Sequence, residues 1–192
     1  LDPLASGILP IALGEATKLV QYMMDDDKIY LFTVTWGEQR STDDSEGEVI
    51  ATSDIRPTQV QITGILPDFM GTIQQTPPAF SAIKVDGERA YDLARAGQVV
   101  ELKARPIEVY ELVITEHTGD TTTFRCVCGK GTYVRSLARK KEKKLGTKGY
   151  VSRLIREGVG PFYLKNAISL DFFLQNADKD TLESIVLPVQ TV

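Results

Sequence analysis

The apolar residues in the first part of the chain change from helical to strand-like spacing. Residues 8–24 carry apolar side chains at mixed helical spacing, which predicts a helix ending at the acidic triplet 25–27. Residues 29–36 are mostly β-branched or aromatic and predict a strand. The polar stretch 38–48 predicts a loop that leads to a short strand over 49–52.

The middle of the chain opens with a helix and then loses its regular spacing. Pro57 marks the start of a predicted helix over 56–70 that stops near Pro67, because proline suits the first turn of a helix and interrupts its interior. The following stretch, 71–97, is rich in turn-forming residues and predicts an irregular excursion. A short helix over 90–96 is expected within it.

Strand patterns return in the second half of the chain. Residues 107–115 and 121–128 predict two strands joined by a hairpin turn at 119–120. A helix is expected from residue 133 to about 144, and Gly146 closes it.

The last part of the chain has weaker patterns. Residues 151–156 suggest a further helix or turn, and the tail 168–192 is acidic and weakly helical. Strands outnumber helices and the hairpins are adjacent in sequence. We therefore predict an α+β fold with a central, mainly antiparallel mixed sheet flanked by helices.

Composition places the chain among globular proteins. Its 192 residues, 42% of them apolar, are enough to bury one large core. The longest apolar runs, such as 8–13, fall far short of the roughly 20 residues that cross a bilayer, so we expect a cytoplasmic protein with no membrane contact. Cys126 and Cys128 would point to the same face of a strand, and a single His117 completes no metal-ligand set. We expect neither a disulfide framework nor a metal.

Charge is distributed unevenly along the chain. The formal net charge is −4, but residues 125–156, here called the basic segment, hold eleven Lys or Arg against one acid, Glu142. Clustered cations can neutralise the phosphates of a nucleic acid, whereas a Lys-rich helix can also be an ordinary solvated surface. Charge alone leaves the partner open.

Three side chains are candidates for chemistry. Asp2 precedes Pro3 and lies near Gly7, so the backbone would hold its carboxylate rigidly. Arg135 lies near the start of a predicted helix and could keep a carboxylate ionised. Tyr30, in an apolar strand, could stack on a base and reach a proton with its hydroxyl. Each residue has an ordinary alternative role, as a turn residue, a surface arginine and a packing tyrosine respectively.

Five blocks of the chain occur in an order that is typical of one enzyme family. They are an Asp between Leu and Pro in 1–10, Lys-x-Tyr at 28–30, Thr-x-Asp-x-x-Gly at 42–47, the Gln-Thr-Pro-Pro-Ala-Phe-Ser-Ala run within 69–97, and 128–137 around Arg135. From residue 1 to about 162 the chain thereby resembles the TruB pseudouridine synthases.

The resemblance implies a cofactor-free isomerisation of the T-loop uridine of tRNA, position 55, to pseudouridine. Asp2 would be the nucleophile, attacking either uracil C6 or ribose C1′ to form a covalent intermediate. Tyr30 would stack on the flipped ring and help to remove the C5 proton, and Arg135 would orient and ionise Asp2. Leu154 is a candidate wall residue of the closed pocket that retains the released uracil.

The same resemblance implies a surface that grips RNA. Residues 71–105 are similar to the family's RNA-binding insertion, and the basic segment would contact the opposite side of the substrate. The expected substrate-binding residues are Lys28, Thr42, Asp44, Phe80, Lys84, Arg95, Lys130, Tyr133 and Leu154, with Arg139 and Lys148 on the basic segment. We expect the T arm of tRNA as the partner and a monomeric protein.

The chain departs from the family pattern in two ways. Residues 140–144 read Lys-Lys-Glu-Lys-Lys where the family has an acid and apolar or small residues, which puts the packing of that helix in doubt. The family's strand before the nucleophile and its C-terminal PUA-type domain are not in the sequence. We therefore interpret 1–165 as a catalytic-domain fragment and 166–192 as its end and a linker.

Other functions are compatible with these residues. A non-catalytic RNA-binding or tRNA-folding module would use the same insertion and leave Asp2 idle. A guide-RNA-dependent enzyme of dyskerin type would share the catalytic blocks, although the insertion at 71–97 favours stand-alone recognition of tRNA. A carboxylate glycosidase is disfavoured, because no motif pairs Asp2 with a second acid.

Overall fold

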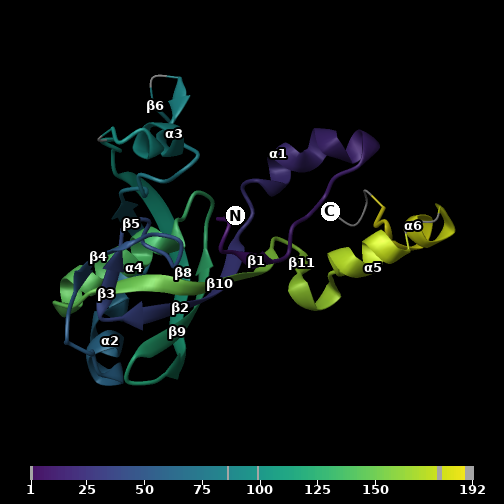
Figure 1. The fold of residues 1–192 in the computed structure, drawn as a ribbon. Helices are drawn as coiled ribbons and strands as arrows, with labels where there is room; N and C mark the ends of the chain where they lie inside the picture. Colours follow the sequence, from purple (N-terminus) through teal and green to yellow (C-terminus); the bar gives the residue numbers. More distant parts are fainter. Residues whose placement is uncertain (1, 86, 99, 177–178, 189–192) are drawn as a thin grey trace.

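A seven-stranded sheet forms the centre of the computed structural model, which describes residues 2–85, 87–98, 100–176 and 179–188 (Figure 1). The strand order is β1-β10-β2-β9-β8-β5, with β11 paired to β10, and every pairing except the parallel pair of β1 and β10 is antiparallel. The predicted α+β fold with a mainly antiparallel sheet is confirmed. The strands are β1 (Ser6–Gly7), β2 (Lys28–Trp36), β5 (Gly71–Gln75), β8 (Arg105–His117), β9 (Thr121–Cys128), β10 (Gly149–Val159) and β11 (Phe162–Tyr163).

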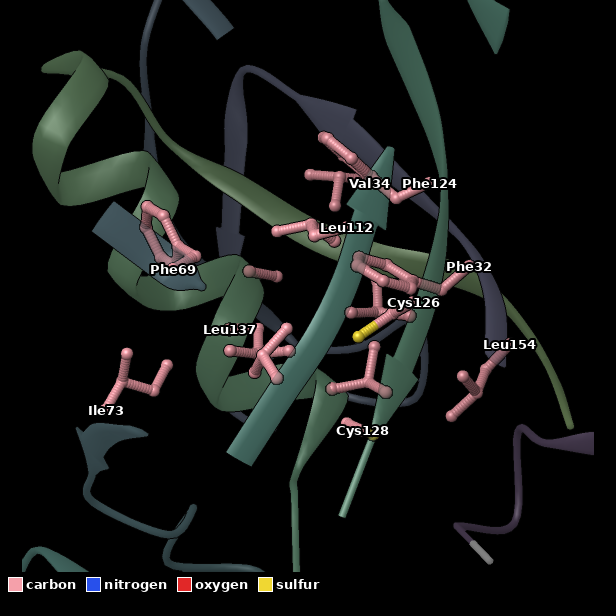
Figure 2. Packing of buried hydrophobic residues seen from close by; sticks show 14 of the residues in the cluster. Phe32, Val34, Phe69, Ile73, Leu112, Phe124, Cys126, Cys128, Leu137 and Leu154 are labelled. Atoms are coloured by element: carbon pink, nitrogen blue, oxygen red, sulfur yellow. The ribbon is translucent and has the colours of Figure 1, made fainter. Parts of the chain in front are cut away.

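Two helices close the hydrophobic core against this sheet. Helix α4 (Val134–Leu145) contacts β10 and α2 (Gln59–Ile65), and the turn η2 (Leu66–Phe69) completes the layer. Gly146 closes α4 as predicted and adopts φ 67°. The helix predicted over 56–70 is shorter: α2 begins at Gln59 after a capping box between Thr58 and Gln61, and η2 follows it. Figure 2 shows Leu137 of α4 facing the side chains of the strands.

Smaller elements lie outside the central sheet. The strands β3 (Glu38–Arg40) and β4 (Val49–Thr52) form one ribbon, and β6 (Lys84–Val85), β7 (Glu88–Arg89) and α3 (Ala90–Arg95) form a projection beyond β5 (Figure 1). The turn η1 (Gly14–Leu19) with α1 (Val20–Met23), and the turn η3 (Leu164–Asn166) with α5 (Leu170–Gln175) and α6 (Lys179–Ile185), extend on the other side. No helix among the described residues is both long and apolar enough to span a bilayer.

The prediction of a helix or turn over 151–156 is wrong, because these residues lie within strand β10. The register of β10 against β2 shifts between Val151 and Arg153 and again between Arg156 and Gly158. Each bulge adds one residue, so the buried Val151, Leu154 and Val159 are spaced by three and five rather than by two. The two bulges therefore give the buried residues of β10 a spacing that resembles that of a helix.

Three further boundaries differ from the predictions. Residues 71–75 form the edge strand β5 rather than an irregular segment, and 38–40 form strand β3 rather than a loop. The helix predicted over 8–24 begins only at Gly14, as a 3-10 helix that leads into α1, and the preceding Leu9, Ile11 and Leu13 are exposed. These short elements depend on pairing with distant strands or lack a buried face, which local spacing does not reveal.

Lys141 lies in the middle of the core. Its side chain is fully buried, its Nζ lies 4.7 Å from the ring centroid of Phe124 and 4.9 Å from that of Phe69, and no described residue hydrogen-bonds it. Helix α4 continues through 140–144, so the unusual run does not break it. Lys141 instead occupies a position at which helical spacing calls for an apolar residue. Burial lowers its pKa from 10.5 to about 8.

We expect Lys141→Met to stabilise the protein. Near pH 7 the folded chain carries a buried, unpaired ammonium, whereas the folded variant carries none. Between about pH 8 and 10.5 the unfolded wild type binds more protons than the folded one, so its stability rises with pH across that interval, by about 3 kcal/mol. At pH 7 the variant should gain a similar amount, which raises Tm by roughly 5–10 °C.

Urea and thermal unfolding at pH 7 and pH 10 measure this effect. Lys143→Met is the matched control, because Lys143 is exposed on the same helix and its replacement should change stability by less than about 0.5 kcal/mol. The prediction would be contradicted if Lys141→Met were less stable than the wild type at pH 7. It would also be contradicted if the stability of the variant rose between pH 7 and pH 10 as much as that of the wild type.

Candidate active site

Arg135, near the start of α4, contacts three segments that are distant from it in sequence. Its Nη2 donates to Asp2 Oδ1 at 2.7 Å and to the Phe80 carbonyl at 2.9 Å. Its Nη1 donates to the Thr42 carbonyl at 3.1 Å and lies 3.4 Å from Asp44 Oδ2. The side chain is only 5% exposed, so these charge-assisted contacts are little screened by water.

Asp2 is held by the chain that follows it. The Ala5 amide donates to the Asp2 carbonyl at 2.9 Å, and β1 pairs with β10 at Ile155 and Arg156. Gly7 adopts φ 109°, and a Cβ there would lie 2.3 Å from the Arg156 carbonyl oxygen, so only glycine permits this approach. The Asp2 side chain keeps 21% of its exposure and can therefore be reached by a substrate.

The loop that contains Thr42 and Asp44 lies behind Arg135. Asp44 is 1% exposed, and its Oδ1 accepts hydrogen bonds from the Thr42 hydroxyl and, at 3.0 Å, from the Glu46 amide. Asp43, at φ 62°, accepts from Arg139 at 2.9 Å through Oδ2. Burial raises the pKa of Asp43, and the Arg139 guanidinium opposes that rise. Asp43 and Asp44 thus each form an ion pair with a different arginine of α4.

Tyr30 lies on β2 between Cys126 of β9 and Arg156 of β10. Burial is the main cause that raises the pKa of its phenol, and the charge of Asp2 acts in the same direction. A hydrogen bond with the Arg156 side chain opposes the rise. The phenol is therefore neutral near pH 7, within electrostatic range of Asp2.

A second set of contacts fixes the beginning of α4, and sequence reasoning missed it. The buried Gln75 side chain accepts from the Tyr133 amide at 2.8 Å and donates to the Tyr133 carbonyl at 3.1 Å. Arg105 lies over the Tyr133 ring at 5.4 Å. Ser136 donates to the Thr76 carbonyl at 2.8 Å. The only sequence signal for Gln75 was its place as the first residue of the Gln-Thr-Pro-Pro run.

The other expected binding residues lie apart from Arg135. Lys84 and Arg95 are exposed on the projection formed by β6, β7 and α3. Lys130 is paired with Asp25 at 2.6 Å, and Lys28 donates to the Met24 carbonyl at 2.7 Å. These two lysines therefore already have partners within the chain.

Leu154 and the cysteines belong to the hydrophobic core. Leu154 is 4% exposed, and Figure 2 shows it at the end of the core nearest the N-terminal segment. Cys126 and Cys128 are both buried and free, on one face of β9 as expected. Within the described part of the chain, no group of three or more His, Cys, Asp or Glu side chains could hold a metal ion.

Comparison with known sequences identifies relatives of one kind. The model of the TruB family pseudouridylate synthases, N-terminal domain, matches residues 1–134. The tRNA pseudouridine synthase B of Mesorhizobium japonicum is 52% identical over 98% of this chain and 61% of its own length. That of Agrobacterium fabrum is 60% identical over 84% of this chain and 52% of its own length. The chain thus spans between half and two thirds of these relatives.

Solved structures share the fold. The crystal structure of a Cbf5-Nop10-Gar1 complex aligns over the whole of this chain and 50% of its own, with a TM-score of 0.72 and 26% identity. The H/ACA ribonucleoprotein bound to a substrate RNA containing 2′-deoxyuridine gives a TM-score of 0.69 at 23% identity, which supports the fold alone. The family model covers most of the chain, including Asp2, Tyr30 and the Thr42–Asp44 loop. The chain belongs to the TruB family of pseudouridylate synthases.

Proposed function

We propose that the protein isomerises the T-loop uridine of tRNA, position 55, to pseudouridine, with Asp2 as the nucleophile. One observation carries the proposal: a partly exposed carboxylate is paired at 2.7 Å with a buried guanidinium, in a chain of the pseudouridylate synthase family. The hydrogen bond from Arg135 fixes the direction of the Asp2 carboxylate, whose free oxygen can act as the nucleophile. Its other partners prevent it from turning away.

The reaction conserves all atoms, so it requires no oxidant or co-substrate. The Asp2 carboxylate adds to uracil C6 or to ribose C1′, and the bond between N1 and C1′ breaks. The uracil turns and forms a bond from C5 to C1′, the bond to the Asp2 carboxylate breaks and regenerates Asp2, the C5 proton leaves, and N1 gains a proton. Tyr30, whose phenol is within electrostatic range of Asp2, would stack on the ring and relay that proton.

RNA recognition is assigned to the surface around this pair. Phe80 is partly exposed, and its backbone carbonyl accepts from Arg135, so we assign its ring to contact with a flipped base. Lys84 and Arg95 on the projection can reach the T-arm backbone. One chain supplies Asp2, Tyr30 and Arg135, so we propose that the protein acts as a monomer. We assign it to the cytoplasm.

Activity on a bare T-arm hairpin tests the proposal. We expect the protein to convert the T-loop uridine of a synthetic hairpin to pseudouridine without any guide RNA. Conversion only in the presence of a guide RNA would favour an enzyme of dyskerin type. Tight binding of the hairpin with no conversion would favour a non-catalytic tRNA-folding module.

We assign Asp44 a positioning role rather than direct contact with the substrate, because it is buried behind Arg135. Asp44→Asn keeps the shape of the side chain and removes the charge that holds Nη1. We expect kcat to fall about 10- to 100-fold while KM for the hairpin changes little, since small displacements of a catalytic group cost that much.

Asp120→Asn is the matched control for Asp44→Asn. Asp120 forms an exposed ion pair with Arg56, and such pairs contribute little to stability. We expect its kcat to equal that of the wild type. A rise in KM without a fall in kcat for Asp44→Asn would show that Asp44 contacts RNA after all.

A further inference from the structure

Most of the basic segment is already engaged within the chain. Lys130 pairs with Asp25, Arg139 with Asp43, and Lys144 with Asp68, while Arg125 lies between Glu111 and Glu157. Arg135 and Lys141 are buried. The eleven cations therefore do not form one continuous surface. Counting them overestimates the number of positive charges that are available to bind RNA.

Two of the remaining lysines line one cleft. A hollow of about 220 Å³ opens between the edge strand β5, at residues 73–76, and α4, at residues 136–143. Arg139, Lys140 and Lys143 line it, no carboxylate does, and neither lysine has an ion-pair partner among the described residues. The cleft thus concentrates positive charge that the fold itself leaves uncompensated.

The size and walls of the cleft limit what it can hold. Its volume lies below the ~300–1,000 Å³ of sites for drug-sized ligands. A phosphate group fits this volume, whereas a complete nucleotide site would need more. Strand β5 ends the sheet, so the side of its backbone that faces away from β8 also offers peptide N–H donors.

The cleft is placed along the helix that carries Arg135. Lys140 and Lys143 follow Arg135 by five and eight residues, about 7.5 and 12 Å along the helix axis. Thr76, whose carbonyl accepts from Arg139 at 3.1 Å, forms the wall shared with the segment that leads to Phe80. An RNA strand that presents one nucleotide to Asp2 would therefore have a neighbouring phosphate within reach of the cleft.

We infer that the cleft between β5 and α4 binds a backbone phosphate of the RNA substrate through Lys140 and Lys143. The inference rests on the proposed function, since it names RNA as the ligand. It also gives a role to the run at 140–144, in which Lys141 faces the core while Lys140 and Lys143 face the cleft.

The salt dependence of RNA binding tests this inference in the full chain. For the T-arm hairpin, we expect Lys140→Gln combined with Lys143→Gln to reduce the slope of log K against log salt by about 1.5 to 2. Binding should weaken about 30- to 100-fold at 0.1 M salt, and the difference should disappear near 1 M. The double Arg variant at the same positions keeps both charges and should retain the wild-type slope.

Lys18→Gln combined with Lys165→Gln is the matched control, with the same change of charge on exposed elements next to α1 and β11, on the far side of the sheet from α4 (Figure 1). A Gln pair at 140 and 143 that leaves the slope unchanged overturns the inference, while pseudouridine formation by the wild type would still support the proposed function. A reduced slope in a protein that forms no pseudouridine supports the cleft and rejects the catalytic proposal. Equal binding of poly-glutamate through the same lysines would assign the cleft to an acidic protein instead and overturn the inference.

Discussion

Asp2→Asn is expected to lower the rate of pseudouridine formation by about 10⁴- to 10⁶-fold, the range seen when an enzyme loses its nucleophile. Asn is nearly isosteric and can still accept the hydrogen bond that Arg135 Nη2 donates at 2.7 Å. Its amide oxygen, however, is a much weaker nucleophile than a carboxylate, so no covalent intermediate should form. Because the geometry is retained, affinity for the T-arm hairpin should change only a few-fold.

Single-turnover conversion of the hairpin measures this rate, and direct binding measures affinity. Asp68→Asn is the matched control, because Asp68 lies on the surface and pairs with Lys144. We expect the control to convert the hairpin at the wild-type rate. Unchanged conversion by Asp2→Asn would show that another group is the nucleophile and that the pair with Arg135 is structural.

Tyr30→Phe is expected to lower the rate by about 10²- to 10⁴-fold, the usual contribution of a general acid or base. The variant keeps the ring that we propose stacks on uracil and loses only the hydroxyl. Burial raises the pKa of this phenol, so it stays protonated through neutral pH and would act as a relay rather than as a phenolate. The loss should therefore be confined to the step that removes the C5 proton.

The two variants can be distinguished by the intermediate that they accumulate. Tyr30→Phe should still form the covalent adduct between Asp2 and RNA, which persists on a denaturing gel, whereas Asp2→Asn should form none. Tyr110→Phe, on the exposed side of β8, is the matched control and should react at the wild-type rate. If Tyr30→Phe retains full activity, its ring alone matters and the proton leaves by another route.

Long, regularly spaced elements were predictable from the sequence alone. Strands β2 and β9 follow their β-branched and aromatic runs, and α4 begins and ends within a residue of expectation because Gly146 supplies its left-handed cap. Strand β10 was missed because two bulges disrupt its alternation. Strand β5 was missed because its partner, β8, lies thirty and more residues further along the chain.

The candidate site could be predicted only by resemblance. Spacing gave no reason to pair Asp2 with Arg135, because a contact across 133 residues depends on the completed sheet. The resemblance supplied that pair and the Thr42–Asp44 loop, but not the layer behind them. Gln75 hydrogen-bonds the backbone of Tyr133, and Arg156 contacts the Ile8 carbonyl and the phenol of Tyr30. Polar residues with such contacts follow no periodic pattern in the sequence.

The partners of Arg135 come from points 133, 93 and 55 residues away along the chain. Contacts of such high sequence separation form late, since several large loops must close before any of them is gained. A renaturing chain would therefore regain turnover only at the end, after its spectroscopic signals of secondary structure have returned. The time at which enzymatic turnover returns would therefore report when the tertiary contacts of Arg135 have formed. Nicked or incompletely refolded molecules would be inactive rather than partly active.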